Sequence, residues 1–543
     1  MVVGTCTQRG IVFQKADLIK TLRQRGFDDL KSQLTITKTK RMGHKYTTRE
    51  EHLYMEFNNP NILVISRFSI QVVRDVFKKY APNHKWRLQN NIPAGEDIPP
   101  ARLIVSKTFK LDSNQQLISD YLDEHVFSPK KIRSTRSSTV LVMKTGLGKT
   151  YVGVAKIREI KKKTLIIVPS KAVMDEWRKA LTACFPSVLV GDYMRKTDGD
   201  VVIMVVNTAT KDIISVKMPG PAGKLKPTKI KYFDYFKRFG FVIYDEIHNY
   251  TSTVKQKALW RTNMACCLGL TATPSDNAWG MDIIFQKHVG PLLHAEKIPE
   301  FNPDQTTWKG IYNPYIYTGP PEYTETKITP ATGWTSHPKM INQFASDPYR
   351  TVLLLDLLNQ LYVRGRNVFV FFKTRLMADQ IQELLLKFIF SGTVHQIDNN
   401  TTQINVGSTV LMGGATDIDK TNAAHSSIVL TTYGYGWQGV SIPKMDTLVF
   451  ATPRMAKMEQ IIGRILRKSG DTTIVREIWD IVDQETELGR KEYTTRRNAI
   501  SKIVKFPKSK PINVSWKDAA ELPWVHPTIM DIVKQLVKIP DDE

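Results

Sequence analysis

The chain has 543 residues, of which 42% are hydrophobic and 24% are charged. This composition is typical of globular proteins and excludes a disordered chain or a fibre, while the length requires several domains because hydrophobic cores stop growing at roughly 250 to 300 residues. No run of about 18 apolar residues predicts a membrane span, and the first residues do not match the pattern of a secretion signal. The net charge of +25 favours a polyanionic partner.

The cysteine pattern predicts a reducing compartment. Cys6, Cys184, Cys266 and Cys267 form no CxxC pair, so we expect neither a disulfide framework nor a zinc site. Cys266 and Cys267 lie in an apolar run that suits a buried strand.

Residues 1–102 are predicted to form a basic α+β domain. A helix is expected over 16–25, and alternating segments at 34–40 and 52–57 predict strands. Residues 1–110 hold 20 Lys or Arg and 9 Asp or Glu, which gives +11. We interpret this domain as a grip on nucleic acid, and a basic domain that contacts only protein partners is the alternative. A Pro-containing segment at 90–102 is the expected boundary.

Residues 103–294 repeat one unit, in which a short apolar run precedes a turn and an amphipathic stretch. The same pattern returns in residues 345–505. The runs that predict buried parallel strands are 138–143, 164–170, 201–207, 241–246, 265–274, 367–372, 427–433, 447–453 and 473–482. Alternating strands and helices predict an α/β fold with two doubly wound parallel sheets, which bind ligands beyond the carboxyl ends of their strands.

Two further segments have a different composition. Residues 295–344 concentrate Pro, Gly and Thr without helical period and are predicted to be a linker or insertion. Residues 506–543 are predicted to form a C-terminal tail with a helix near 528–538.

The segment MKTGLGKT, residues 143–150, follows a predicted strand and precedes a helical pattern, as a phosphate-binding loop does. Glycines let backbone amides close around phosphate oxygens, Lys149 neutralises phosphate charge, and Thr150 binds Mg²⁺. Met143 stands where Gly or Ala is usual, and an ordinary strand, turn and helix with a surface lysine is the alternative. The expected nucleotide-binding residues here are Thr145, Gly146, Gly148, Lys149 and Thr150.

Two acidic residues end the predicted strand at 241–246. Asp245 is expected to hold Mg²⁺ through water and Glu246 to orient the attacking water, while a solvated strand end is the alternative. His248 is predicted to couple this site to Thr271 and Thr273, and a hydrogen-bonded structural histidine is the alternative.

Residues 458–470 have helical spacing. Gln460 and Arg464 are four residues apart and Arg464 and Arg467 three apart, so one helix face would carry all of them. Arginine forks onto phosphate oxygens and can stabilise charge in the transition state of phosphoryl transfer. A solvated basic helix end is the alternative.

In chain order, the segments TGLGKT, VPSKA, DEIH, LTATP, TTYGYGWQG and QIIGRILR resemble the motif set of superfamily 2 DExH helicases. The segments TTYGYGWQGVS and ATPRMAKMEQIIGRILR are similar to those of the transcript-release helicases of poxviruses and their asfarvirus counterparts. The resemblance implies two RecA-like lobes, ATP hydrolysis with Mg²⁺, and a large cytoplasmic DNA virus as the source.

The resemblance also implies further site residues. Gln115 matches a glutamine that reads adenine, although Asn114 replaces the usual aromatic residue before it. Gly439 and Gln460 match nucleotide-contacting positions, and Ser441 replaces an acidic ribose contact. A further set of residues matches positions that contact the nucleic-acid backbone, or the motif that joins these contacts to the nucleotide. These residues are Pro169, Ser170, Lys171, Thr208, Lys373, Thr374 and Thr431.

Other aromatic and basic residues leave two interpretations open. Tyr433, Tyr435 and Trp437 would either stack on bases or, as we favour, pack against the sheet. The basic runs at 129–136, 156–163 and 224–231 would either line a nucleic-acid path or form solvated faces.

The sequence therefore predicts an ATP-dependent helicase or translocase in viral transcription, which releases nascent RNA or remodels template DNA, with DNA favoured over RNA. The expected partners are the viral RNA polymerase or transcription factors, and no membrane is expected as a partner. The expected locations are the host cytoplasm and the virion. Two alternatives are a nucleic-acid-stimulated ATPase that senses or remodels without separating strands, and the motor subunit of a nuclease.

Overall fold

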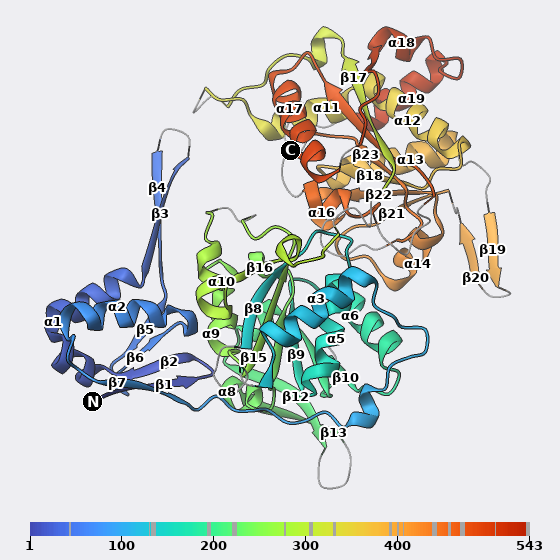
Figure 1. The fold of residues 1–543 in the computed structure, drawn as a ribbon. Coiled ribbons are helices and arrows are strands. Elements are labelled where there is room, and N and C mark those ends of the chain that lie inside the picture. The colour runs from blue at the N-terminus through green and yellow to red at the C-terminus, as the bar shows by residue number, and fades with distance from the viewer. Residues whose placement is uncertain are drawn as a thin grey trace. The chain divides into compact units, whose positions relative to one another are not determined.

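The structure is a computed structural model that describes residues 1–42, 45–129, 131, 137–192, 197–219, 225–275, 279–302, 308–329, 333–389, 394–398, 401–404, 407–436, 442–453, 458–466, 473–504 and 506–538. The chain divides into two compact units, residues 1–305 and 306–543 (Figure 1). No helix in the described part of the chain is long and apolar enough to cross a membrane.

The first unit begins with a mixed sheet of five strands in the described residues. Two helices, α1 (Lys15–Gln33) and α2 (Ile70–Tyr80), bury Leu22, Phe27 and Phe77 in the core beside this sheet. The α+β class and the helix predicted over 16–25 are confirmed. In sheet order the strands are β5 (Tyr54–Phe57), β6 (Ile62–Ile65), β2 (Gly10–Gln14), β1 (Val2–Thr7) and β7 (Trp86–Asn90).

A separate two-stranded hairpin extends from this sheet (Figure 1). It consists of β3 (Thr35–Met42) and β4 (Lys45–His52), which pair antiparallel. We call it the β3–β4 arm.

The next part of the first unit is a parallel sheet, in which seven strands are described. Helices α3 (Ser113–His125), α5 (Lys149–Ile160) and α6 (Lys171–Cys184) share one hydrophobic core with it. Helices α7 (Val206–Ala209), α8 (Tyr232–Phe236), α9 (Gln256–Arg261) and α10 (Asp282–Val289) share another. In order, the strands are β10 (Val190–Asp192), β11 (Val201–Val205), β9 (Thr164–Val168), β14 (Phe241–Tyr244), β15 (Cys266–Thr271), β8 (Ser137–Val142) and β16 (Leu292–His294).

The second unit contains another parallel sheet with seven strands in the described residues. In order they are β21 (Ser408–Val410), β22 (Ile428–Thr432), β18 (Val368–Phe372), β23 (Thr447–Phe450), β24 (Arg476–Asp483), β17 (Gly310–Thr318) and β25 (Ile512–Ser515). The helices in its two cores include α11 (His337–Ser346), α12 (Pro348–Val363), α13 (Arg375–Phe388), α16 (Met458–Ile462), α17 (Glu487–Ile503) and α19 (Pro527–Val537). The predicted pair of doubly wound parallel sheets is confirmed, as is the final helix.

One difference concerns the segment predicted to be a linker. Within it, β17 pairs with both β24 and β25 and is buried over most of its length. The strand GIYNPYIYT has only two aliphatic residues, Ile311 and Ile316, and Tyr, Asn and Pro separate them, so no apolar run predicts it. Two of its buried phenols donate to aspartates elsewhere in the chain, Tyr312 to Asp480 over 2.7 Å and Tyr317 to Asp347 over 2.7 Å.

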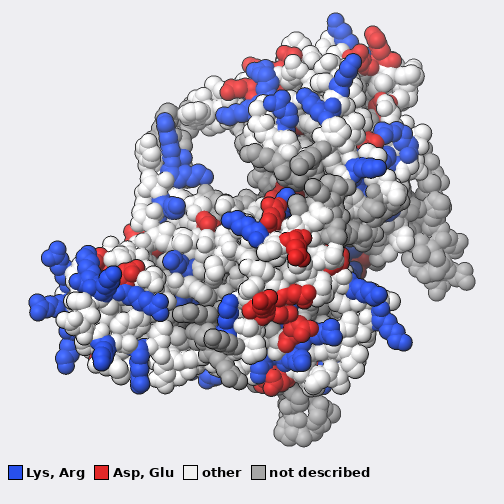
Figure 2. Space-filling view, viewed as in Figure 1, with Lys and Arg blue, Asp and Glu red and all other residues white. Residues whose placement is uncertain are grey.

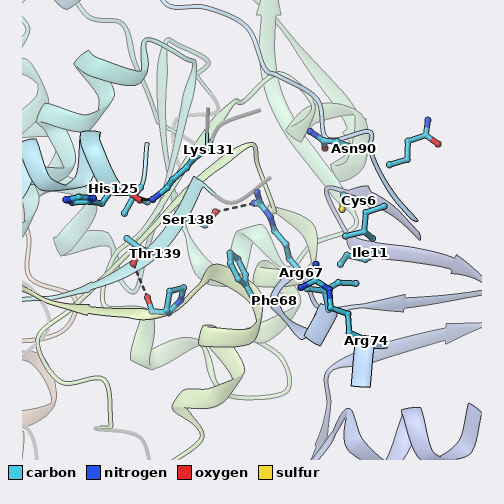
Figure 3. A pocket seen from close by; sticks show the side chains of 15 residues that line it. Cys6, Ile11, Arg67, Phe68, Arg74, Asn90, His125, Lys131, Ser138 and Thr139 are labelled. Carbon is cyan, nitrogen blue, oxygen red and sulfur yellow. Dashed lines mark hydrogen bonds between the residues drawn. The ribbon is translucent and has the colours of Figure 1, made fainter. Parts of the chain in front are cut away.

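The N-terminal domain contacts the first parallel sheet through Arg67, which lies in the short helix η1 (Arg67–Ser69) after β6. Arg67 is buried and donates to the backbone oxygen of Met264 over 2.8 Å and to Ser138 Oγ over 3.2 Å. A cavity of about 730 Å³ lies at this junction. Figure 3 shows Arg67 and Arg74 on one side of the cavity and His125 and Lys131 on the other. None of the predicted site residues that the structure describes lines it.

The basic run at 156–163 helps to hold the segment between these two parts. Lys162 pairs with Asp97 over 2.8 Å and Lys163 pairs with Glu96 over 2.5 Å. Lys156 is fully buried, where it donates to the backbone oxygen of Ser119 over 2.8 Å. These three lysines therefore have structural partners within the first unit.

Candidate active site and nucleic-acid contacts

Three predicted motifs of the first unit lie at one edge of its parallel sheet. Strand β15 lies between β14 and β8, and its registry places Thr271 beside Val142 and Gly269 beside Tyr244. Because these strands are parallel, the phosphate-binding loop, the acidic pair and the Thr271–Thr273 segment all begin at their carboxyl ends.

The loop between β8 and α5 has the backbone that a phosphate-binding loop requires. Gly146 and Gly148 have φ of 85° and 86°, a region that glycine enters without strain. Helix α5 begins at Lys149, so its amino end, which carries partial positive charge, lies directly after the loop. Lys149 Nζ donates to the backbone oxygen of Met143 over 3.3 Å.

Met143 is accommodated because it belongs to the core. Its side chain is buried in the cluster between the sheet and α3, α5 and α6. Its amide donates to the backbone oxygen of Thr271 over 3.0 Å, which ties the loop to the neighbouring strand. A larger residue than Gly or Ala at this position therefore leaves the loop backbone in place.

Gln115 lies against the phosphate-binding loop. Its Nε2 donates to the backbone oxygen of Leu147 over 3.0 Å, and a Cβ at Gly148 would collide with the same atom. Asn114 holds a different loop, because its side chain bonds to the backbone oxygen and nitrogen of Asn302 over 2.7 and 3.2 Å. The position of the usual aromatic residue is thus used here to hold the backbone at Asn302 by hydrogen bonds.

Asp245 is buried beneath the loop. Its Oδ2 accepts a hydrogen bond of 2.7 Å from Trp177 Nε1, and its Oδ1 accepts one of 3.0 Å from the amide of Glu246. Burial and the nearby Glu246 carboxylate raise the pKa of Asp245 to about 7, while the Trp177 N–H and Lys149 act in the opposite direction. Trp177 was not predicted from the sequence, where it is only one apolar position of an amphipathic helix.

Glu246 has a strained backbone and a side chain that faces histidine. Its φ of 46° lies in the left-handed region, which is uncommon for residues other than glycine. Its Oε2 is buried without a hydrogen bond, 3.3 Å from His248 Nδ1. Strain of this kind persists where the surrounding structure holds a functional geometry.

The structure brings His248, Thr271 and Thr273 together. His248 Nδ1 lies 2.9 Å from Thr271 Oγ1, which also accepts a hydrogen bond of 3.1 Å from the amide of Thr273. A continuous polar chain therefore runs from Glu246 to the end of β15. His248, Thr271 and Thr273 lie as close together as the predicted coupling requires. Their role in coupling stays a prediction.

The predicted nucleic-acid residues occupy equivalent places on the two parallel sheets. Ser170 caps α6 by accepting from the amide of Val173, and the exposed Lys171 follows it. Thr374 caps α13 by accepting from the amide of Met377, and the exposed Lys373 precedes it. Each hydroxyl thus has a capping role that is sufficient to explain it. Pro169 is half-buried at the end of β9, and Thr208 is buried on α7.

The last predicted residues lie in the second unit. Thr431 is fully buried and donates to the backbone oxygen of Leu411 over 2.7 Å, which commits its hydroxyl to the core. Tyr433 stacks against Phe371 and Phe450, as the packing interpretation predicted. The predictions for Trp437, Gly439, Ser441 and Arg467 lie outside the described residues.

The helix predicted over 458–470 is shorter. Helix α16 ends at Ile462, and the amide of Arg464 bonds to Ile461 O, three residues back, in a tightened turn. Gly463, which has a low helix propensity, marks this change. Gln460 and Arg464 are both buried. The predicted common helical face extends over the first helical turn only, because α16 ends before Arg464.

A glycine-bearing loop before a helix and an acidic pair at the same edge of a parallel sheet, followed by a second parallel sheet, form the arrangement expected of a helicase-type ATP hydrolase. Residues 108–276 match the family model described as "Type III restriction enzyme, res subunit". The comparisons with individual proteins identify relatives in viruses.

The chain is 29% identical over 417 residues to "Putative ATP-dependent RNA helicase QP509L" of African swine fever virus (strain Badajoz 1971 Vero-adapted), which covers 72% of this chain and 73% of the relative. It is 22% identical over 384 residues to "Transcript termination protein A18" of Fowlpox virus (strain NVSL), which covers 65% and 76%. The chain thus carries a helicase domain and is homologous to these viral proteins, which confirms the predicted resemblance.

Among solved structures, "S. cerevisiae Dbp5 bound to RNA and ADP BeF3" is 12% identical, with 79% of this chain and 98% of that chain covered and a TM-score of 0.44.

Proposed function

We propose that this protein hydrolyses ATP to translocate on or remodel nucleic acid during transcription of a large cytoplasmic DNA virus. The observation that carries the proposal is the single sheet edge where Lys149, Asp245 and Glu246 lie. The fowlpox relative is named as a transcript termination protein, and we propose the same process for this chain. DNA is the proposed substrate, and RNA is the alternative that the name of the swine fever virus relative supports.

Buried polar atoms near this edge support nucleotide binding. Thr145 Oγ1 and Thr273 Oγ1 are buried without a hydrogen-bond partner. Buried polar groups normally have partners, so two such atoms in neighbouring motifs fit a polar ligand. Mg²⁺ bound with ATP would neutralise charge that develops on the phosphates.

Each residue has a proposed task in hydrolysis. The backbone amides of Gly146 and Gly148 bind phosphate oxygens, and Lys149 neutralises their charge. Thr150 and Asp245 hold the cation. Glu246 orients the water that attacks the terminal phosphate and accepts its proton. Gln115, already fixed to the loop, positions the adenine.

Arg464 and Arg467 are proposed to stabilise charge on the phosphate during transfer, and Gln460 and Gly439 to contact the nucleotide. Arginine suits this task because it stays charged and presents a planar fork to phosphate oxygens. We also propose that nucleic acid binds at the first turns of α6 and α13, through Lys171 and Lys373. Helix amino ends bind phosphate groups well.

The test is the rate of ATP hydrolysis titrated with single-stranded DNA, duplex DNA and RNA of one sequence. We expect stimulation that is greatest with DNA. A strand-displacement assay on labelled duplexes distinguishes a helicase from an ATPase that moves without separating strands. Cleavage of the same duplexes with Mg²⁺ would instead support the nuclease-motor alternative, and co-purification with the viral polymerase tests the proposed partner.

A further inference from the structure

The β3–β4 arm is a basic ribbon without a core of its own. Residues 37–48 contain Lys38, Lys40, Arg41 and Lys45 but no Asp or Glu. Its described side chains beyond the base are exposed on both faces, and Tyr46 is 73% exposed. Figure 2 shows Lys and Arg side chains along the arm and over the N-terminal sheet and its helices.

The registry of the arm sorts its side chains onto two faces. Lys38 pairs across from Arg49 and Lys40 from Thr47, so these lysines share one face. Arg41 pairs across from Tyr46 on the other face. An isolated two-stranded ribbon is marginally stable, so the arm requires an anchor elsewhere in the protein. Its exposed aromatic ring and its cations indicate a surface that binds a partner.

The anchor is a polar cluster around the buried Glu51 at the base of the arm. Arg49 pairs with Glu51 over 2.5 Å and also donates to the backbone oxygen of Thr251 over 2.6 Å. The buried Glu51 carboxylate accepts from Thr253 Oγ1 over 2.8 Å and from Gln256 Nε2.

This cluster fixes the arm to the connection between β14 and β15 of the first parallel sheet. Thr251 directly follows the short helix η3 (Ile247–Tyr250), which begins directly after Glu246. The arm is therefore attached to the chain segment that leaves the proposed catalytic acids.

We propose that the β3–β4 arm binds the sugar-phosphate backbone of nucleic acid and that Glu51 transmits this contact to the ATP site. The inference rests on the proposed function. Clustered lysines bind phosphates, and an exposed Tyr ring stacks on bases. A two-stranded ribbon also fits the width of a DNA major groove. A protein partner on the arm is the competing outcome.

The binding half is tested in the full-length protein with the double variant Lys38→Ala/Lys40→Ala and with Tyr46→Ala. Affinity for labelled single-stranded DNA, duplex DNA and RNA is measured over a series of salt concentrations. The slope of log affinity against log salt should flatten by about 0.7 to 0.9 for each phosphate that a lysine no longer neutralises. Tyr46→Ala should weaken binding to single strands by about fivefold to a hundredfold.

The matched control is Lys20→Ala/Lys78→Ala, which removes two exposed lysines from α1 and α2 of the same domain. It should change the slope much less than the arm variant. An equal change of slope in the control would show that nucleic acid responds to positive charge anywhere on this domain. An unchanged slope and affinity in the arm variants would assign the arm to a protein partner. Either result overturns the proposal.

The coupling half is tested with Glu51→Gln and, because Glu51 is buried, also with Thr253→Ala, which removes one donor. Both should show a smaller ratio of stimulated to unstimulated ATP hydrolysis even at saturating nucleic acid, where a loss of affinity caused by a loosened anchor no longer affects the rate. A wild-type ratio in both variants would overturn the coupling. If wild-type protein hydrolyses ATP without any response to nucleic acid, the proposed function is wrong. The binding measurements would then still test whether the arm binds nucleic acid.

Discussion

Trp177 Nε1 donates a hydrogen bond of 2.7 Å to Asp245 Oδ2, and both side chains are buried. The bond joins α6, which is capped by Ser170 and begins at Lys171, two proposed nucleic-acid residues, to the proposed cation ligand. It fixes the carboxylate orientation and favours its ionised form, against the effect of burial. We therefore regard Trp177 as a positioning residue.

The first prediction follows from the pKa of Asp245, which is raised to about 7. A carboxyl group binds a cation in its ionised form, so the apparent Mg²⁺ affinity in ATP hydrolysis should fall as the pH falls through this value. Trp177→Phe removes the donor to the carboxylate, so the pKa rises and the fall should begin at higher pH. Mg²⁺ titrations across a pH series measure this, with Trp260→Phe as the control. Identical pH dependence in wild type and Trp177→Phe would refute the role of Trp177.

A second prediction concerns Lys149. Lys149→Ala should abolish ATP turnover without loss of folding, because a partly exposed loop lysine contributes little to packing. Lys144→Ala is the matched control in the same loop, since Lys144 pairs with Glu296 over 2.7 Å at the surface. The control should keep its turnover. Phosphate release by both variants is the measurement, and turnover in Lys149→Ala would rule out the assignment.

Glu246→Gln should bind ATP and hydrolyse it poorly. The amide preserves the shape of the side chain but is not a base for the attacking water. Binding of a fluorescent ATP analogue and phosphate release separate the two steps. Loss of ATP binding in this variant would mean that the roles of Asp245 and Glu246 have been exchanged.

Arg464→Ala should lower turnover by about a thousandfold or more, with a smaller loss of nucleotide affinity, as for an arginine that acts in the transition state. Arg464→Lys should not restore the rate because lysine lacks the planar fork. Since Arg464 is buried, thermal unfolding of each variant is measured in parallel. Equal losses of rate and affinity would indicate ground-state binding. Arg467→Ala is predicted to behave in the same way.

Arg67→Ala should destabilise the first unit by about 2 to 4 kcal/mol, because it leaves the buried Met264 carbonyl group and the half-buried Ala265 carbonyl group without their charged donor. Arg74→Ala, at an exposed residue of the same cavity, should change the free energy of unfolding by less than about 0.5 kcal/mol. Denaturant unfolding compares the two. Similar small effects would show that Arg67 does not hold the N-terminal sheet in place.

The strands of the two parallel sheets could be predicted because both faces are buried, which produces uninterrupted apolar runs such as TLIIV at 164–168. Strand β17 was missed because its polar side chains are satisfied by Asp480 and Asp347, far away in sequence. The tightened turn after Ile462 was missed because the helical spacing of the surrounding residues was given more weight than the low helix propensity of Gly463.

The site, like the fold, could be predicted from the sequence only in part. Motif spacing predicted that His248 and Thr271 meet, since both follow neighbouring strand ends. The bond between Trp177 and Asp245 joins positions 68 residues apart and depends on how α6 lies over the sheet, which no local pattern contains. Lys156 was grouped with a basic run on charge alone, whereas tertiary structure buries it.

The most direct test of the central claim is the rate of ATP hydrolysis by wild-type protein as nucleic acid is added, measured beside Lys149→Ala. We predict hydrolysis that rises to saturation with nucleic acid in wild type and is absent from the variant. Hydrolysis that persists in Lys149→Ala, or a wild-type rate that is unchanged by single-stranded DNA, duplex DNA and RNA alike, would contradict the account.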